Sequence, residues 1–168
     1  MKRVIIIGCG GAGKSTLARQ LGEKTGLPVV HLDSIFWLPG WVERDRDEFD
    51  ELVRREMEKD SWILDGNYKR TIQERLSRCD TIIYLDFSRW ACLYGIFKRL
   101  VTNIGKTRPD MGKGCKEKVD WEFVKWVWNF NKNKRERYYR MLHEAEGKEV
   151  VILKNRRMVK RFLRSIEP

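Results

Sequence analysis

The chain has 168 residues, 42% of them hydrophobic, which is enough for the core of one domain of ordinary size. Its formal net charge of +11 makes it strongly basic. No stretch approaches the roughly 18–20 apolar residues that a membrane span requires, and the apolar run near the N-terminus is too short for a signal peptide. The four cysteines show no paired spacing. We therefore expect a cytoplasmic protein with no membrane partner.

Two kinds of segment alternate along the chain. Short, continuous apolar runs are typical of strands buried on both faces of a parallel sheet, and they occupy 3–8, 27–33, 61–66, 80–87 and 148–154. Patterns with helical spacing occupy 14–24, 46–60, 68–79, 88–101, 120–145 and 156–166. This alternation predicts one α/β domain over residues 1–168, in three layers around a five-stranded parallel sheet.

Residues 8–15, GCGGAGKS, match the phosphate-loop motif G-x-x-x-x-G-K-[ST] between a strand and a helix. Glycines let the backbone N–H groups face an anion, and the N-terminus of the next helix adds positive charge there. In this motif Lys14 reaches the β- and γ-phosphates and Ser15 can coordinate Mg²⁺. We predict a nucleoside triphosphate site, with ATP and Mg²⁺ as cofactors. Its residues are Gly8, Cys9, Gly10, Gly11, Ala12, Gly13, Lys14, Ser15 and Thr16.

Residues 31–41, HLDSIFWLPGW, follow the second apolar run. We expect Asp33 at the carboxyl end of that strand, where α/β sheets bind ligands. A kinase that phosphorylates a hydroxyl group needs a carboxylate there to take its proton; the alternative is a capping aspartate. Trp37 and Trp41 flank a Pro-Gly turn and form either a stacking wall for an acceptor or simple core or lid packing. His31 alternates with apolar neighbours, and we expect it to be structural.

Residues 62–73, WILDGNYKRTIQ, place a second carboxylate, Asp65, at the end of a buried strand. P-loop proteins hold Mg²⁺ at such a position, usually through water. We therefore predict that Asp65 and Ser15 hold the metal, with a turn or cap aspartate as the alternative. Asn67 and Tyr68 follow closely and can line the acceptor pocket with Asp33.

Residues 102–119 break the alternation, because they contain three glycines, one proline and many cations but few apolar side chains. Long loops inside compact domains are usually functional, and we predict a mobile basic lid here. Phosphoryl transfer is catalysed mostly by positioning and charge neutralisation, to which a closing lid contributes arginines. Arg108 lies in this segment, and Arg99 ends the helix before it.

The order of these segments resembles that of nucleoside monophosphate kinases. Residues 62–73 are similar to the adenylate kinase segment with a strand followed by D-G-F-P-R-T-x-x-Q, except that Asn67-Tyr68-Lys69 replace Phe-Pro. The resemblance implies an adenylate or shikimate kinase-like P-loop NTPase fold with an acceptor-binding insertion at about 34–60. It places Gly66 and Arg70 in the acceptor pocket.

The same resemblance implies roles for several arginines. Arg99 and Arg108 would act with Lys14 on the transferring phosphoryl group, and Asp33 is the fourth catalytic candidate. Arg135 and Arg137 would form a second arginine pair, and Asn155-Arg156 would lie near the adenine. More narrowly, HLDSIFWLPGW, WILDGNY and RPDMGKGC look like adenylate-kinase-related proteins labelled "DNA topology modulation protein", a label that establishes no reaction.

The basic excess lies in one part of the chain. Residues 98–161 contain 19 Lys or Arg and 8 Asp or Glu, whereas the rest contains 16 of each. A clamped polyphosphate, a docked polyanion and a solvated basic face each account for it. We favour ATP-dependent phosphoryl transfer to a small acceptor, namely a nucleoside, a nucleotide or another polar alcohol. The alternatives are an ATP-binding, nucleic-acid-associated regulator and a polynucleotide 5′-hydroxyl kinase.

The helix predicted from residue 120 is unusually aromatic, with Trp121, Phe123, Trp126, Trp128 and Phe130 at mixed spacing. These rings cannot all face one core, so either packing against the sheet accounts for them or some contact a partner or a symmetry mate. The sequence leaves the oligomeric state open.

Overall fold

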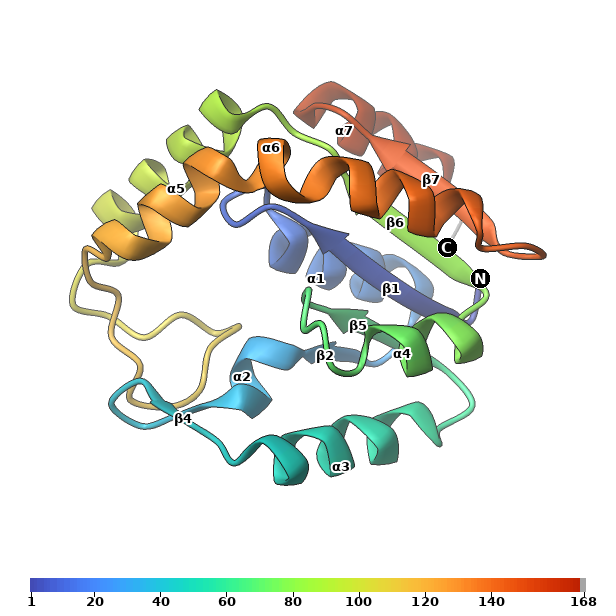
Figure 1. Cartoon of the computed structure of the whole chain (residues 1–168), viewed down its shortest axis with the longest axis horizontal. Helices are drawn as coiled ribbons and strands as arrows, with labels where there is room; N and C mark the ends of the chain where they lie inside the picture. The colour runs from blue at the N-terminus through green and yellow to red at the C-terminus, as the bar shows by residue number, and fades with distance from the viewer. Residues whose placement is uncertain (167–168) are drawn as a thin grey trace.

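A computed structural model describes residues 1–166 and shows that the five apolar runs form one parallel sheet (Figure 1). The strands are β1 (Arg3–Gly8), β2 (Val29–His31), β5 (Trp62–Asp65), β6 (Thr81–Leu85) and β7 (Glu149–Leu153). Their order is β2-β5-β1-β6-β7. Ile6 of β1 lies opposite both Asp65 of β5 and Ile83 of β6. The predicted α/β class and five-stranded sheet are confirmed, and all carboxyl ends meet at one edge.

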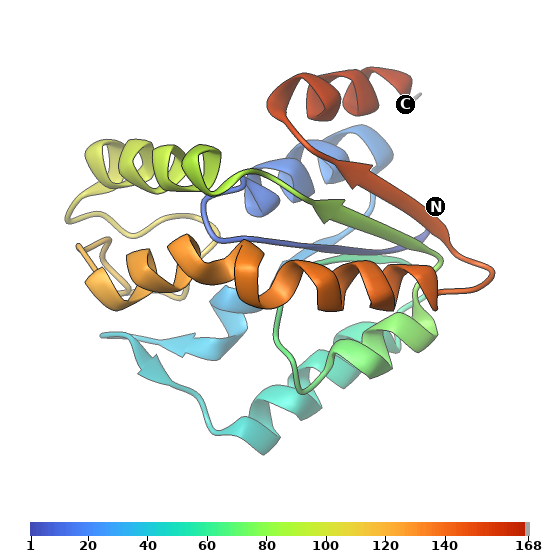
Figure 2. The same cartoon turned by 45° about the horizontal axis from the view of Figure 1, so that its top comes forward.

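Helices cover both faces of the sheet (Figures 1 and 2). One face packs on α1 (Lys14–Thr25), α5 (Arg89–Asn103) and α7 (Arg156–Ser165), and the other packs on α3 (Arg46–Met57) and α4 (Ile72–Arg78). The long α6 (Trp121–His143) joins both cores, through Val127 on the first side and Leu142 on the second. Within residues 1–166, no helix combines the length and apolar character needed to cross a bilayer.

The central strand shows why its sequence is continuously apolar. Val4 and Ile6 point into the core under α1, whereas Ile5 and Ile7 point into the core over α3 and α4. All four are completely buried. Because both faces of a parallel sheet are covered, alternate residues do not need to be polar.

The connection between β2 and α3 differs from the sequence-based prediction. β2 ends at His31, and the chain continues into a short helix, α2 (Leu32–Phe36), and an antiparallel hairpin of β3 (Trp37–Leu38) and β4 (Val42–Glu43). Elements this short carry no readable periodicity, so the sequence did not predict them. They fill the first part of the predicted insertion at 34–60, whereas α3 belongs partly to the main core.

The segment after β5 also differs, because α4 begins at Ile72 instead of near residue 68. The guanidinium group of Arg75 is completely buried and donates hydrogen bonds to the carbonyl groups of Gly66, Asn67 and Tyr68. These three carbonyl groups therefore accept hydrogen bonds from a side chain of the following helix. As a result, residues 66–68 form a fixed loop at the carboxyl end of β5.

The buried central strand gives a direct test of this packing. We expect Ile6→Ala to lower the free energy of unfolding by about 2–5 kcal/mol, because it leaves a cavity in a fully packed core. Val42→Ala is the control, since Val42 is 56% exposed on β4 and its truncation should change stability by less than about 0.5 kcal/mol. Urea denaturation measures both, and equal effects would contradict the assigned burial.

Candidate functional site

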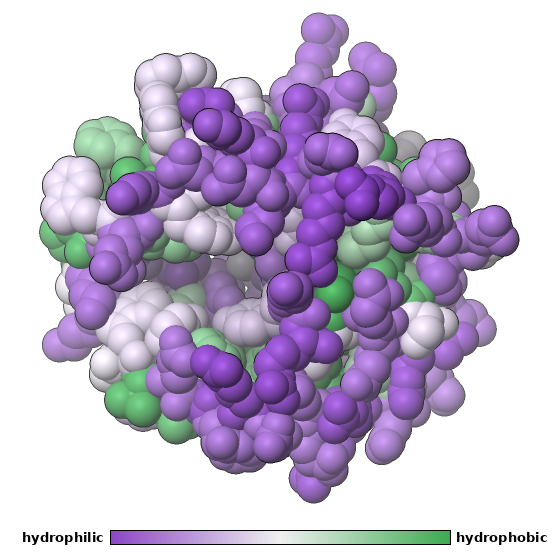
Figure 3. Space-filling model, viewed as in Figure 1, coloured by the Kyte–Doolittle hydropathy of each residue, from purple (hydrophilic) through white to green (hydrophobic). Residues whose placement is uncertain are grey.

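A cavity of about 1290 Å³ opens at the carboxyl edge of the sheet, and Figure 3 shows its mouth as a hollow in the molecular surface. Single small ligands occupy pockets of roughly 300–1,000 Å³, so this cavity has room for a nucleotide and a second small molecule. Most of the site residues that the sequence predicts lie here. They are Gly10, Gly11, Gly13, Lys14, Ser15, Thr16, Asp33, Trp37, Trp41, Gly66, Asn67, Tyr68, Arg99 and Arg108.

The phosphate loop is shaped by glycines that no other residue can replace without movement. Gly11 and Gly13 adopt positive φ angles of 76° and 93°. A Cβ atom on Gly11 would lie 2.2 Å from the carbonyl oxygen of Cys92. α1 begins directly at Lys14, whose Nζ donates to the carbonyl of Cys9 at 3.2 Å. The loop and the N-terminus of α1 therefore present the arrangement that binds phosphate.

Three residues of the predicted ATP site form the back of this loop and do not line the cavity. The backbone N–H of Gly8 donates to Asn67 Oδ1 at 3.0 Å, and Asn67 Nδ2 donates back to the carbonyl of Gly8 at 2.8 Å. Cys9 and Ala12 are buried. Contact with the Cys92 thiol and burial raise the pKa of Cys9, so it stays a neutral packing side chain.

The sequence predicts Asp33 at the carboxyl end of the second strand. In the structure β2 ends at His31, and Asp33 lies two residues further on, in the first turn of α2. The hydroxyl group of Tyr68 donates to Asp33 Oδ1 at 2.7 Å. Burial raises the pKa of Asp33, and the hydrogen bond from Tyr68 and the charges of Lys14 and Arg108 reverse this only in part. The side chain is thus a carboxylate that accepts a proton more readily than an exposed aspartate does.

Asp65 ends β5 and contacts His31 at the end of β2. Asp65 Oδ2 lies 2.9 Å from His31 Nδ1, which donates to it. Asp65 Oδ1 is buried and has no hydrogen-bond partner within residues 1–166. Because a buried carboxylate oxygen without a donor is costly, this atom fits a cation or a cation-bound water. Ser15 lines the cavity, whereas Asp65 is 4% exposed and lies behind its lining, so their joint role at a magnesium site stays a prediction.

His31 is a site residue that sequence reasoning missed. It lines the cavity, although the sequence led us to expect a structural side chain. Burial lowers the pKa of His31, but the hydrogen bond and charge of Asp65, with smaller contributions from Asp110 and Asp33, raise it above its ordinary value. The signal for a site role is the position of His31 at the carboxyl end of β2, which its alternation with apolar residues concealed.

The segment at 102–119 is packed more closely than a loose loop. α5 takes its first two residues, and isolated β-bridges join Ile104 to Glu117 and Thr107 to Lys116. Met111, Cys115 and Glu117 are buried. The segment predicted to be a mobile basic lid is thus a folded loop, and its residues 108–111 and 117–118 line the cavity.

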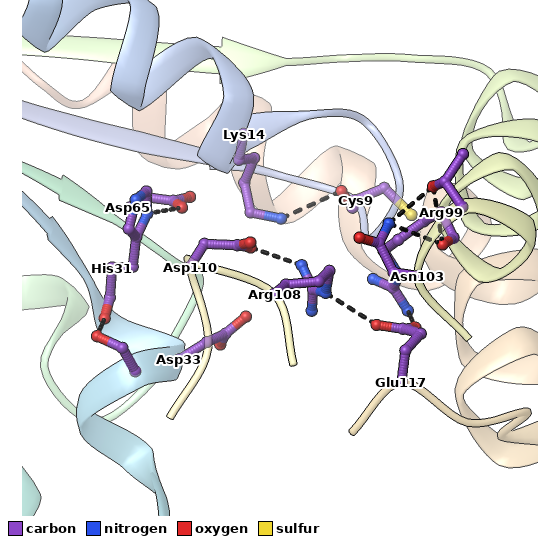
Figure 4. Close-up of polar contacts among 12 residues, drawn as sticks. Cys9, Lys14, His31, Asp33, Asp65, Arg99, Asn103, Arg108, Asp110 and Glu117 are labelled. Carbon is purple, nitrogen blue, oxygen red and sulfur yellow. Dashed lines mark hydrogen bonds and ion pairs between the residues drawn. The ribbon is translucent and has the colours of Figure 1, made fainter. Parts of the chain in front are cut away.

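Two arginines of the site share acidic partners from the lid. Glu117 Oε1 lies 2.8 Å from Arg99 Nη2, and its Oε2 lies 2.8 Å from Arg108 Nε. Arg108 also pairs with Asp110, and Figure 4 shows this group beside Lys14 and Asp33. The two guanidinium groups are therefore neutralised by two carboxylates. Arg99 Nε is buried and has no acceptor within residues 1–166, which suits an additional anion.

The lid is also attached to the tryptophan hairpin. Trp41 Nε1 donates to the carbonyl of Lys116 at 2.9 Å, and the thiol of Cys115 donates to the carbonyl of Leu38 at 3.2 Å. Trp41 has a φ angle of 66°, which is unusual for a bulky residue, and its indole bond to the lid helps to hold it there. Trp37 and Trp41 meet edge to face at 5.5 Å and both line the cavity.

Three arginines that the resemblance placed at the site lie elsewhere. Arg70 Nε donates to Asp50 Oδ2 at 2.9 Å, because Asp50 is 6% exposed and requires a cation. Arg135 pairs with the buried carboxylate of Asp86, and Arg137 is exposed on α6. None of the three lines the cavity.

Arg156, which the resemblance placed near the adenine, lines the cavity. It donates to the carbonyl of Gly11 at 3.3 Å and stacks over the ring of Phe87 at 5.0 Å. Its partner Asn155 caps α7 by accepting from the backbone N–H of Met158. Arg156 therefore places a cation beside Gly11 of the phosphate loop.

No family model matches the chain. Adenylate kinases of Thermotoga neapolitana and Thermotoga maritima are 32% and 31% identical over 80 residues, which is 48% of this chain. The match spans only 36% of the length of those curated relatives. The sequence similarity therefore covers only part of each chain. It supports a protein that is related to P-loop kinases.

Solved shikimate kinases cover almost the whole chain. The enzyme from Acinetobacter baumannii, in complex with shikimate, has a TM-score of 0.60 at 17% identity, over 99% of this chain and 90% of that one. The enzyme from Bacteroides thetaiotaomicron has a TM-score of 0.55 at 18% identity, over 97% and 94%. These likenesses confirm the predicted adenylate and shikimate kinase-like P-loop fold. The narrower resemblance to proteins labelled "DNA topology modulation protein" is not shown and stays a prediction.

The buried role of Glu117 can be tested by proteolysis of the lid. We expect Glu117→Gln to speed tryptic cleavage within residues 104–118 by about 10-fold, because a neutral amide leaves the two partly buried guanidinium groups without their shared counter-charge. Glu122→Gln, at an exposed position on α6, is the matched control. Equal cleavage rates in both variants and the parent would show that Glu117 does not hold the lid.

Proposed function

We propose that the protein transfers a phosphoryl group from ATP to a hydroxyl group of a small polar molecule, such as a nucleoside, a nucleotide or another polar alcohol. One observation carries this proposal. The phosphate-loop residue Lys14 and the raised-pKa carboxylate of Asp33 line the same cavity. The partial adenylate kinase similarity and the shikimate kinase-like fold agree with it.

The triphosphate would lie against the phosphate loop, where backbone N–H groups and the N-terminus of α1 bind its oxygens. Lys14 would move from the carbonyl of Cys9 to the β- and γ-phosphates. Arg108 and Arg99 would exchange part of their contact with Glu117 for the transferring group. Mg²⁺ bound with the nucleotide would neutralise phosphate charge, with Ser15 and Asp65 Oδ1 as the groups that hold it.

The acceptor would lie on the opposite side of the cavity. Asp33 would accept the proton of the attacking hydroxyl group, and the hydrogen bond from Tyr68 would keep its carboxylate turned in one direction. Trp37 and Trp41 would provide the apolar wall against which the acceptor packs. Because the lid contacts this hairpin, the acceptor side and the arginine side would be assembled together.

The nucleic-acid alternative has less support. Several cations from the basic part of the chain line the cavity, where a kinase requires them, namely Lys98, Arg99, Arg108, Lys118, Arg156 and Lys160. A polynucleotide 5′-hydroxyl kinase remains compatible with the same catalytic groups. The effect of ionic strength on binding distinguishes nucleic-acid binding from ATP binding. Binding through many phosphates weakens steeply as the salt concentration rises, and binding of ATP in a cavity does not.

Phosphoryl transfer is tested first by ADP release from Mg·ATP with a panel of nucleosides, nucleotides, sugar-like alcohols and 5′-hydroxyl oligonucleotides. We expect one class of small acceptor to stimulate release. Lys14→Ala should abolish turnover, because the charge that faces the transferring phosphates is lost, while circular dichroism stays unchanged. Lys59→Ala, on the surface after α3, is the control. Turnover retained by Lys14→Ala would exclude the phosphate loop as the reacting site.

Asp33 gives a second test with a pH signature. We expect Asp33→Asn to slow transfer at least about 100-fold, because the amide cannot take the hydroxyl proton. In the parent protein kcat should fall on acidification, since Asp33 must be deprotonated to act, and its raised pKa places this decline at a higher pH than an exposed aspartate would. The variant should lose that decline, and the exposed Asp47→Asn should keep it. An unchanged profile in Asp33→Asn would make Asp33 structural or the acceptor a phosphate.

A further inference from the structure

The outward side of α5, with the residue that follows its C-terminal end, carries a row of large apolar side chains, which we name the α5 seam. Its members are Trp90, Tyr94, Phe97, Val101 and Ile104, which are 68%, 66%, 64%, 63% and 63% exposed. They follow one another at intervals of four, three, four and three residues. This is the heptad spacing with which one helix packs along another.

The seam is not a by-product of core packing, because α5 buries its opposite side. Cys92 and Ile96 face the core, and Arg99 faces the lid. Figures 1 and 2 show α5 at the outer edge of the molecule, with none of the other described elements lying over its outward side. In Figure 3, pale and green side chains gather at this edge, while most of the visible face is purple.

The exposed apolar area is large enough for a specific interface. Large aromatic side chains bury roughly 150–250 Å² each, so the three rings of the seam expose about 400 Å² between them. Val101 and Ile104 bring the seam to roughly 600 Å² on each copy, or about 1,200 Å² for two copies, which is the lower end of the range for specific interfaces. A standard protein–protein interface buries about 800 Å² on each partner.

We propose that the α5 seam binds the α5 seam of a second copy of this chain, in a two-fold symmetric dimer. Heptad spacing is self-complementary, since each apolar side chain fits between those of a like helix. The chain is strongly basic, but Ala91, Leu93 and Leu100 flank the seam without charge, and the cations Arg89 and Lys98 lie to the sides of the apolar row. Two copies can therefore meet there with their like charges held at the rim.

Part of this surface is already ordered for contact. The rings of Trp90 and Trp128 meet edge to face at 5.1 Å, and the guanidinium group of Arg89 lies 4.9 Å from the centre of the Trp128 ring. Trp90 is thus supported by α6 while most of its surface stays exposed. Fixing an anchor residue in advance reduces the entropy lost on association.

The dimer would border the nucleotide cavity. Tyr94 belongs to the seam and also lines the rim of the cavity, and Lys98, about one turn further along α5, lines the cavity too. A second copy on the seam would therefore lie at the cavity mouth. This proposal concerns association alone and does not depend on the identity of the reaction.

Sedimentation velocity of the full chain over a range of protein concentrations tests the proposal. We expect a dimer for the parent, and we expect Phe97→Glu and Val101→Lys to weaken association at least about 30-fold, because each places a charge at the centre of the interface. Both positions are exposed, so circular dichroism and the melting temperature should stay close to those of the parent. Val42→Glu, an exposed apolar position on β4, should leave the dimer intact.

Two results would overturn the proposal. A parent protein that stays monomeric at high concentration excludes the self-association of the seam. A dimer that survives both Phe97→Glu and Val101→Lys lies on another surface. Vesicles containing anionic lipid and a single-stranded oligonucleotide are run in parallel, and a monomer that binds either one through these residues would assign the seam to that partner instead.

Discussion

The contact between the phosphate loop and α5 constrains both the candidate site and the outward surface of the helix. An added Cβ on Gly11 would lie 2.2 Å from the carbonyl oxygen of Cys92, and one on Gly95 would lie 2.1 Å from that of Gly11. Two backbones therefore touch where side chains usually keep elements apart. This contact holds Arg99 at the cavity, and it turns Trp90 and its row outward.

The cavity gathers opposite charges before any ligand is present. Glu117 and Asp110 neutralise Arg99 and Arg108, so the lid can fold over a strongly cationic region without unpaired guanidinium groups. An anionic ligand would exchange one charged partner for another instead of removing water from a bare cation. The same carboxylates thus stabilise the lid and leave the arginines available to a phosphate.

Patterns among neighbouring residues in the sequence predicted the elements whose structure depends mainly on those neighbours. Continuous apolar runs located the strands of the sheet, and the glycine spacing at 8–15 located the phosphate loop, because each depends on neighbouring residues. The pairs His31–Asp65 and Arg99–Glu117 join positions that belong to separate elements, and no periodicity connects them. The sequence could not show where Arg70 lies for the same reason, since its partner Asp50 belongs to α3.

The two sides of the cavity are specified in different ways. The phosphate side consists of backbone N–H groups and a helix N-terminus, which any chain with this fold and glycine pattern can supply. In the proposed function, the acceptor side would depend on Asp33, Tyr68 and the Trp37–Trp41 hairpin, which the sheet does not determine. The choice of acceptor would then reside in these side chains, because a fold supplies a site and its side chains supply the specificity.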